Sequence, residues 1–330
     1  MRTFRYVVLR LLGMVGTLLV ISVITYAIFY LLPSNPAQLS CGRPCTPQRL
    51  AEASAFMGYD KPWATQYLDF LGGIVAGRHF GSGAAAVDCA APCFGYSFRL
   101  NASVTSLIVE RAPVTFSIAI GAAVLWLLLG VGAGVVAAVR RGTLADRAAM
   151  VFATIGVSSP AYLIGLLGIL LFGFTLNVVP VGGYVPLTQS PVDWAWHLIL
   201  PWCVLALLSA AVYARLTRGQ MLEVLDEDYI RTARAKGLRE RRVIGRHGLR
   251  NVLIPVITVF GLDLGTLLGG AVISERVFSM QGLGALLLDA VSSSDLPLIV
   301  GVTLFSAVLV IFANFVVDMV YSLLDPRVVR

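Results

Sequence analysis

Six long apolar runs are the feature that most restricts the fold of this chain. An α-helix needs about 20 apolar residues to cross the roughly 30 Å hydrocarbon core of a bilayer. Six runs approach or exceed this length, at about residues 11–32, 113–139, 148–176, 197–214, 252–273 and 296–324. Only 13% of the residues are charged and 58% are hydrophobic, whereas about a quarter of the residues of a soluble domain are charged. We therefore expect an all-α, polytopic membrane protein with six transmembrane helices.

The distribution of Lys and Arg predicts the orientation of these helices. With a cytoplasmic N-terminus, residues 1–10, 140–147, 215–250 and 325–330 lie inside, and they hold 18 of the 25 Lys and Arg residues. Short cytoplasmic loops carry such an excess of cations in membrane proteins. The net charge of +7 is thus explained by topology and contact with membrane lipids. Nucleic acid is not an expected partner, because no basic stripe is interleaved with base-stacking aromatics.

This topology divides the chain into three parts. Residues 1–32 form an N-terminal transmembrane helix, residues 33–112 an extracytoplasmic loop region, and residues 113–330 a five-helix core with a cytoplasmic loop at 215–250. In the loop region, Thr46 and Pro47 are typical of a helix N-cap and first turn. A second helix is expected after Pro62, an inserted loop at 81–91, and a surface helix at 104–111 that leads into the second span.

Four of the five cysteines fall in the extracytoplasmic region, in two C-x-x-x-C pairs. An exported segment is an oxidising environment, which favours disulfides over a structural zinc site. The spacing leaves all three pairings open. The four cysteines are Cys41, Cys45, Cys89 and Cys93. Cys203 lies alone inside the fourth span and is expected to be a small core residue.

Motifs for catalysis are absent from the sequence. Neither lysine stands in a phosphate-binding G-x-x-x-x-G-K-[ST] loop, and no histidine has a second metal ligand three or four residues away. There is no G-x-S-x-G nucleophile elbow. We expect no enzyme activity, no metal site and no cofactor in this chain, which leaves passage across the membrane as the function to consider.

Polar side chains within apolar spans are candidates for a translocation pathway, since they are costly in a bilayer. Asp263 lies in the fifth span, where it could attract a substrate amine or simply bond a neighbouring helix. Asn314 lies one helical turn before Asp318 in the sixth span, and so on the same face of that helix. Asp318 could face the pathway, bond a neighbouring helix or simply lie near the cytoplasmic end. Ser158 and Ser159 precede Pro160, which interrupts the third span and predicts a bend, either a gate hinge or a packing kink.

The loop at 215–250 holds ten of the 25 Lys and Arg residues and is the largest polar surface expected in the cytoplasm. Within it, Asp228-Tyr-Ile-Arg-Thr-Ala-Arg-Ala-Lys-Gly237 is typical of a short helix that ends at a left-handed glycine. A helix held at the membrane surface between two spans gives a partner protein a place to bind and move. A basic loop that serves only topology would explain the arginines but not this glycine.

Several segments together resemble the permease subunits of bacterial ABC importers, in the dipeptide, oligopeptide and nickel branch. The segment from Tyr229 to Gly237, followed by Arg250-Asn-Val-Leu-Ile-Pro255, is similar to the coupling region of that family. Further similar segments run along essentially the whole chain. They are Phe94-Gly-Tyr-Ser97, Arg111-Ala-Pro-Val-Thr115, Glu275-Arg-Val-Phe278, Gly282-Leu-Gly284 and Leu324-Asp-Pro-Arg327.

The resemblance implies a type I ABC importer permease fold in the bacterial inner membrane. It implies a second permease subunit as a heterodimer partner, two cytoplasmic ATPases that hydrolyse the ATP, and an extracytoplasmic substrate-binding protein. Coupling to the ATPases is assigned to Asp228, Tyr229, Arg231, Thr232, Ala233, Arg234, Lys236 and Gly237. The expected cargo is a di- or oligopeptide, and nickel, haem or another small ligand is the alternative within the family. An ion-coupled carrier and a membrane scaffold are alternatives outside it.

Two departures from the family pattern bear on the extracytoplasmic side. Gln281 stands where the family usually has proline, which puts the rigidity of that turn in doubt. An insertion around residues 81–93 brings in the second cysteine pair. We expect that Cys41 or Cys45 bridges to Cys89 or Cys93, and that the stiffened loop helps to seat the binding protein.

Overall fold

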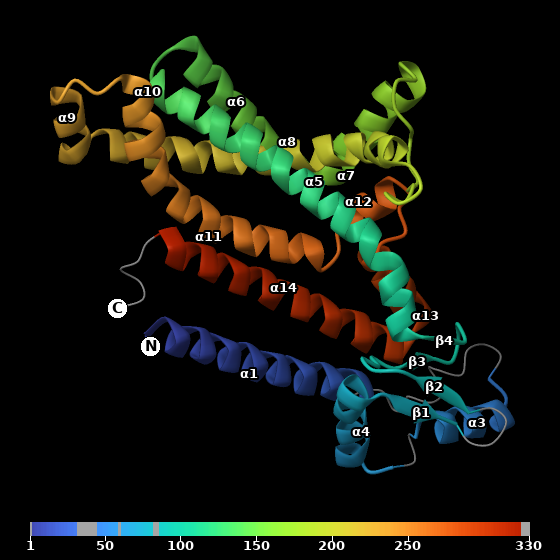
Figure 1. The fold of residues 1–330 in the computed structure, drawn as a ribbon. Helices are drawn as coiled ribbons and strands as arrows, with labels where there is room; N and C mark the ends of the chain where they lie inside the picture. The colour runs from blue at the N-terminus through green and yellow to red at the C-terminus, as the bar shows by residue number, and fades with distance from the viewer. Residues whose placement is uncertain (1, 32–44, 59–60, 82–85, 325–330) are drawn as a thin grey trace.

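Helices formed by the long apolar runs dominate the structure. The computed structural model describes residues 2–31, 45–58, 61–81 and 86–324. Among these residues, five helices are long and apolar enough to cross a membrane, and a bent helix pair makes six if it is counted as one span. The five helices, drawn in Figure 1, are α1 (Arg2–Leu31), α5 (Val104–Val139), α8 (Pro191–Leu225), α11 (Leu249–Leu268) and α14 (Leu296–Leu324). The prediction of a mostly helical protein with multiple spans is confirmed.

The third apolar run is broken where the sequence predicted an interruption. Helix α6 (Leu144–Ser158) ends just before Ser159 and Pro160, and α7 (Ala161–Gly168) continues into a π-helical segment, Ile169–Thr175. Proline lacks a backbone N–H and disfavours helical geometry in the residue before it. The two halves are bent by 104° relative to each other. The bend is therefore a sharp corner between two helices.

Small residues bring α5 and α8 into close contact. A Cβ atom added at Gly130 would lie 2.9 Å from the carbonyl oxygen of Ala210, and one at Gly134 would lie 2.6 Å from the carbonyl oxygen of Ala214. Helix association in a bilayer depends on such close backbone packing, because lipid tails are as apolar as the side chains. The two glycines thus set the distance between the two longest helices of the core.

Two predicted helix boundaries are wrong. Residues 104–111 do not form a separate surface helix, because α5 is continuous from Val104 and is capped by Ser103, whose Oγ accepts from the backbone N–H of Ser106 at 3.1 Å. The fifth span does not reach residue 273, because α11 ends at Leu268. Gly270 has φ +136°, a conformation outside the helical region. A new short helix, α12 (Val272–Val277), begins after it.

The segment between the first two spans contains the two predicted helices, α3 (Pro47–Met57) and α4 (Trp63–Ala76). Thr46 caps α3 as expected, since its Oγ1 accepts from the backbone N–H of Arg49 at 3.3 Å. Pro62 stands at the N-cap of α4. Both local predictions are confirmed.

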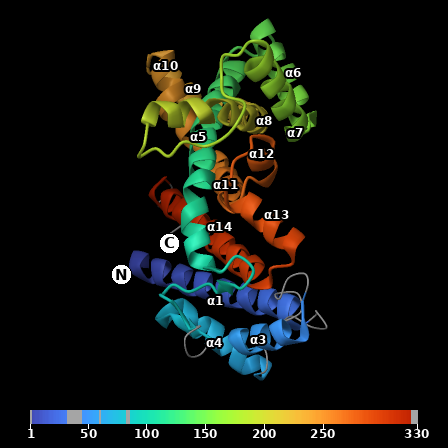
Figure 2. The same ribbon diagram turned by 90° about the vertical axis from the view of Figure 1, so that its right-hand side faces the viewer.

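Two short antiparallel hairpins in this segment were not predicted. Strand β1 (Arg78–Phe80) precedes the expected inserted loop and pairs with β2 (Val87–Cys89), which lies within that loop. Strand β3 (Tyr96–Ser97) pairs with β4 (Ala102–Ser103). Helix α4 packs its Phe70 against Tyr26 of α1 and lies beside that helix in both Figure 1 and Figure 2. The lobe formed by α3, α4 and the hairpins is thereby fixed to the first span.

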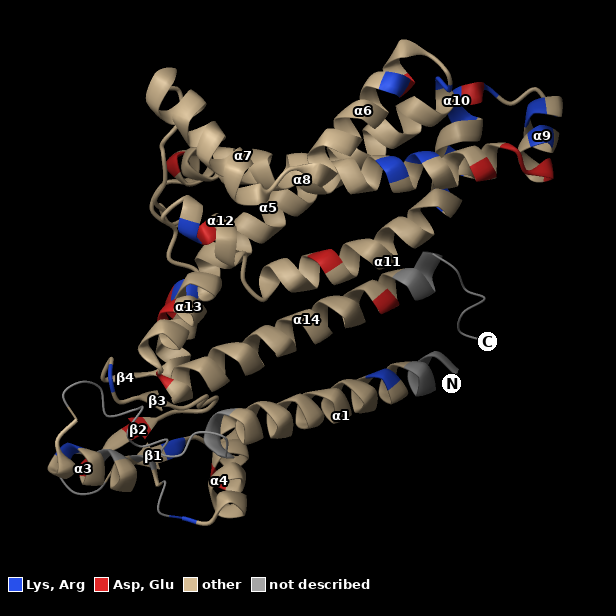
Figure 3. Cartoon of the chain, turned by 180° about the vertical axis from the view of Figure 1, so that it is seen from behind, with Lys and Arg blue, Asp and Glu red and all other residues tan. Residues whose placement is uncertain are grey.

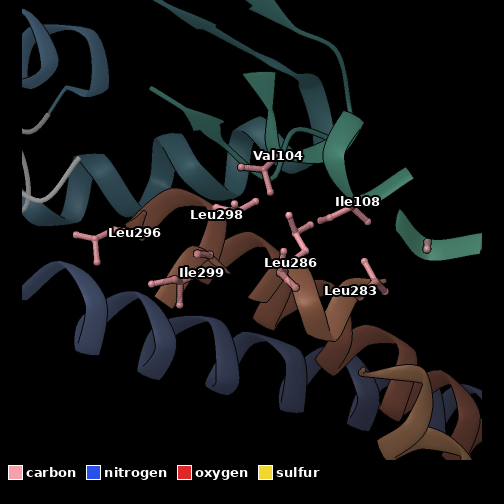
Figure 4. Close-up of a cluster of buried hydrophobic side chains, with 10 residues drawn as sticks. Val104, Ile108, Leu283, Leu286, Leu296, Leu298 and Ile299 are labelled. Atoms are coloured by element: carbon pink, nitrogen blue, oxygen red, sulfur yellow. The ribbon is translucent and has the colours of Figure 1, made fainter. Parts of the chain in front are cut away.

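A second apolar cluster holds α13 (Leu283–Ser293) against the spans on either side of it. Leu283 and Leu286 of α13 meet Val104 and Ile108 of α5 and Leu298 of α14 (Figure 4). All five are buried. The body of α13 is therefore part of the apolar core.

The remaining short helices lie at the opposite end of the molecule from the lobe. They are α9 (Asp228–Ala235) and α10 (Glu240–Arg242), followed by a π-helical segment, Val243–Gly248, that leads into α11. The first turns of α1 and the last turns of α14 point toward this same end in Figure 1. Lys and Arg gather around α9 and α10 in Figure 3. The two terminal helices and the loop at 215–250 thus reach the same end of the molecule, as the distribution of Lys and Arg in the sequence predicted.

Candidate coupling surface and translocation pathway

The end of α9 has the geometry that the sequence predicted. Gly237 has φ +74°, in the left-handed region that glycine adopts without steric cost. Its N–H donates to the carbonyl oxygen of Arg234 at 2.9 Å, and the N–H of Leu238 donates to the carbonyl oxygen of Ala233 at 3.3 Å. These two bonds are the 5→2 and 6→1 bonds of a Schellman motif, which stops a helix at a defined residue.

One face of α9 is anchored to the rest of the chain. Ile230 is fully buried and Ala233 is 7% exposed, and both pack with Val243 of the π-helical segment. Partly buried Leu225, at the end of α8, contacts the same cluster. Since α8 runs without interruption from Pro191 to Leu225, α9 is joined by an apolar contact to the end of a 35-residue helix.

The opposite face of α9 is exposed among the described residues, so a partner protein can contact it. Seven of the eight residues that the resemblance assigned to ATPase coupling are exposed, and Ala233 is the exception. The exposed ones are Asp228, Tyr229, Arg231, Thr232, Arg234, Lys236 and Gly237. Arg234 pairs with Glu240 at 2.7 Å, which raises the pKa of the guanidinium further above its usual value. The helix thus presents a polar face on an apolar base.

An ion pair that the sequence analysis missed fixes the start of α6 to α8. Asp146 at the start of α6 accepts from Arg218 Nε at 2.6 Å and from Arg218 Nη2 at 2.9 Å. The backbone N–H of Gly142 donates to the same carboxylate at 3.0 Å. The Asp146 side chain is 6% exposed. The only signal in the sequence was a single acid between Arg141 and Arg147.

Asp263, the first pathway candidate, contacts α8. Its Oδ2 accepts from the hydroxyl of Tyr213 at 2.8 Å, and the residue is half-buried. Asn314 is half-buried on α14. Gly261 and Gly265 on α11 form the face that packs against α14, and Asp263 lies on the other side of that helix. The structure therefore does not bring Asp263 and Asn314 together.

The other polar residues of the spans have local partners. Ser158 donates its hydroxyl to the carbonyl oxygen of Thr154 at 3.0 Å, and Ser159 donates to that of Ile155 at 2.7 Å. Such bonds to the preceding turn are common for serine in helices. Asp318 pairs with Arg10 of α1 at 2.9 Å. This contact agrees with the expectation that Asp318 bonds a neighbouring helix.

The cysteines correct two expectations. Cys89 and Cys93 are bonded to each other with an S–S distance of 2.03 Å, so neither is available for a bridge to the first pair. The expected bridge between the two pairs is wrong, because the turn between β2 and residue 93 brings the two sulfurs of one pair together. Cys45 is also disulfide-bonded, and Cys41 lies outside the described residues. Cys203 is a free, exposed thiol, so its expected place in the core is wrong as well.

The fold and the exposed α9 define a class of protein: a multi-pass membrane protein with a helical contact surface between two spans. Two family models match nearly the whole chain. Residues 3–119 match the N-terminal region of the binding-protein-dependent transport system membrane component, and residues 130–330 match the binding-protein-dependent transport system inner membrane component. The chain belongs to this family, the permease subunits of ABC importers, and is a multi-pass inner membrane protein.

Curated relatives agree with this family. A putative peptide transport system permease protein of Brucella abortus is 38% identical, over 97% of each chain. A di/tripeptide transport system permease protein of Pseudomonas aeruginosa is 39% identical, over 98% of each chain. The dipeptide transport system permease protein of Escherichia coli K12 is 37% identical, over 97% of this chain and 98% of its own. These names place the chain in the dipeptide and oligopeptide branch.

A solved structure shares the fold. The methionine ABC transporter MetNI, in inward-facing conformations, matches with a TM-score of 0.51 at 18% identity, over 67% of this chain and 97% of its own. The expected type I permease fold is confirmed by this likeness. At this identity the match concerns the fold alone.

Proposed function

We propose that this chain is a transmembrane subunit of an ATP-driven importer of di- or oligopeptides. It forms half of the translocation pathway together with a second, different permease subunit, and it has no ATPase site and binds no cofactor. Two ATPase subunits bind on the cytoplasmic side, and a substrate-binding protein delivers peptide on the other side. The names of the relatives support the peptide cargo, and both termini are cytoplasmic because the cationic loops require it.

The exposed face of α9 is the observation that carries this proposal. Its polar side chains are exposed although Tyr229 accepts from Asn251 of α11 and Arg234 pairs with Glu240, while Ile230 and Ala233 hold the helix in place. Residues 228–237 are thus the ATPase contact. Movement of the docked helix is passed to α8 through the apolar anchor and converted into alternating access by rigid movement of the spans. Asp263 faces the pathway and attracts the peptide amine, while Ser158, Ser159 and Asn314 line it.

A bulky residue on the exposed face of α9 tests the ATPase contact. We expect Thr232→Trp to abolish co-purification of the ATPases, because Thr232 is exposed and an indole there fills the contact surface without disturbing the buried anchor. Thr65→Trp is the matched control, since Thr65 is exposed on α4 in the lobe at the other end of the molecule. Equal recovery of ATPases with both variants would remove α9 from the contact.

A further inference from the structure

The N-terminus of α13 is capped by side chains of other helices. The first backbone N–H groups of a helix have no partner within it, and the N-cap residue here is Gly282, which has no side chain. The N–H of Leu283 donates to Thr115 Oγ1 of α5 at 2.8 Å. The N–H of Ala285 donates to Glu275 Oε2 of α12 at 2.7 Å. Residues from two other helices therefore supply the cap.

Thr115 and Glu275 also bind each other. The Thr115 hydroxyl donates to Glu275 Oε1 at 2.7 Å, so three helices meet at one hydrogen-bonded group. Thr115 and Glu275 are both fully buried. No ion pair between described residues involves Glu275, and burial raises the pKa of its carboxyl. We call this group, Thr115 with Glu275 and the first turn of α13, the clasp.

Glycines make room for the clasp. A Cβ on Gly282 would lie 2.5 Å from both the Glu275 carboxyl carbon and Thr115 Oγ1. A Cβ on Gly284 would lie 2.9 Å from the backbone nitrogen of Val272, at the start of α12. These distances are shorter than any real Cβ contact. The Gly-Leu-Gly segment is therefore required by the approach of α12 to α13.

The other side of α12 contacts a different part of the bundle. The carbonyl oxygen of Phe278, just after α12, accepts from the N–H of Gly183 at 3.1 Å. A Cβ on Gly165 of α7 would lie 2.9 Å from the Val277 side chain. Helix α12 thus links α5 and α13 on one side to α7 and the segment around residue 183 on the other. In Figure 1 this junction lies toward the end of the molecule that carries the lobe.

A buried carboxylate is a poor choice for stability alone. Desolvating it costs several kcal/mol, and apolar residues of similar volume often hold a core at least as firmly. The body of α13 is already held by apolar contacts with α5 and α14 (Figure 4). Hydrogen bonds at its first turn can break and re-form while that apolar contact stays in place. Hydrogen bonds of this kind are therefore suited to a contact between helices that breaks and re-forms.

We propose that the Thr115–Glu275 clasp keeps the outer end of the translocation pathway shut until the substrate-binding protein docks. This rests on the proposed function. Thr115 and Glu275 are positioning residues: they hold α12 against α13 and make no contact with the cargo. Breaking the clasp removes the buried hydrogen bonds at the first turn of α13 and lets α7 move with α12, while the exposed Arg276–Asp289 ion pair remains as a link between α12 and α13. In an importer without the clasp, the outer end of the pathway opens and ATP is hydrolysed even when the binding protein is absent.

The test compares ATP hydrolysis by the whole reconstituted transporter with and without its binding protein. We expect Thr115→Val to raise hydrolysis in the absence of binding protein about fivefold or more, the lower range of allosteric coupling. Thr115→Ser keeps the hydroxyl and is expected to behave as the wild type. Thr154→Val is the matched control, since that hydroxyl bonds only the preceding turn of its own helix, at Met150. A loss of structure alone lowers the rates of ATP hydrolysis with and without the binding protein and leaves the ratio of these two rates unchanged.

Glu275→Gln provides a second variant should Thr115→Val fail to assemble. Glutamine has nearly the same shape, but an NH2 group replaces one of the two carboxyl oxygens, so either the Thr115 hydroxyl or the Ala285 N–H then faces a donor in place of its acceptor. The same rise in unstimulated hydrolysis is expected. If the wild type responds to binding protein and both variants respond equally well, the clasp proposal is wrong. If the wild type itself shows no response, the proposed function fails instead.

Discussion

Replacing Ala233 with tryptophan is expected to abolish ATP-driven transport while the protein still inserts in the membrane and assembles. Ala233 lies on the buried face of α9, is 7% exposed, and packs with Ile230 and Val243. An indole does not fit in this space, because overpacking a core displaces the backbone at a cost of about 1–3 kcal/mol. The indole displaces α9 from its apolar contacts with Val243 and Leu225. ATP hydrolysis then no longer moves the spans. Transport and hydrolysis are measured together in the reconstituted complex.

Smaller changes in α9 provide the controls. Ala233→Ser adds one oxygen and is expected to keep transport coupled to hydrolysis. Gly237→Val places a β-branched residue at φ +74°, which costs roughly 1–2 kcal/mol, and is expected to weaken coupling. Asparagine tolerates this conformation, so Gly237→Asn is expected to retain the coupling of transport to ATP hydrolysis. Normal coupled transport by Ala233→Trp and Gly237→Val would refute the role given to this helix.

Replacing Asp146 with alanine is expected to cause the largest loss of stability among single changes to charged residues of segments 140–147 and 215–250. Removing one partner of a buried ion pair costs roughly 3 kcal/mol or more, because it leaves the other charge uncompensated. The Arg218 side chain is 25% exposed and Asp146 is 6% exposed, so water replaces only part of the lost contact. The midpoint of thermal unfolding in detergent is expected to fall by several degrees.

The matched control for Asp146→Ala is Asp228→Ala. Asp228 also pairs with an arginine, Arg231, at 3.3 Å, but the side chains are 95% and 69% exposed. Exposed pairs contribute between zero and about 1 kcal/mol, so this variant is expected to unfold at nearly the wild-type temperature. Equal midpoints for the two variants would show that the Asp146–Arg218 pair does not hold the loop to α8.

Features that depend on neighbouring residues could be predicted from the sequence. The spans follow from the length of the apolar runs, and Thr46, Pro62 and Gly237 set helix ends through contacts within a few residues. The break at Pro160 has the same local origin. The family was recognisable because several such segments occur in order along the chain.

Features that depend on distant residues could not be predicted in this way. Thr115 caps a helix that begins 168 residues later, and Asp146 pairs with a residue 72 positions away. The Cys89–Cys93 bond depends on a turn that no periodicity marks. The hairpin strands are only two or three residues long, too short for an alternating pattern to appear. The sequence contained these residues without showing which of them meet.

The most direct test of the central claim is peptide uptake by the reconstituted transporter, with this chain, its second permease, the ATPases and the binding protein. Uptake of a radiolabelled dipeptide is measured with active ATPases and with ATPases whose hydrolysis has been disabled by mutation. The account predicts uptake only with active ATPases and the binding protein present. Uptake that persists when ATP hydrolysis is disabled would contradict it.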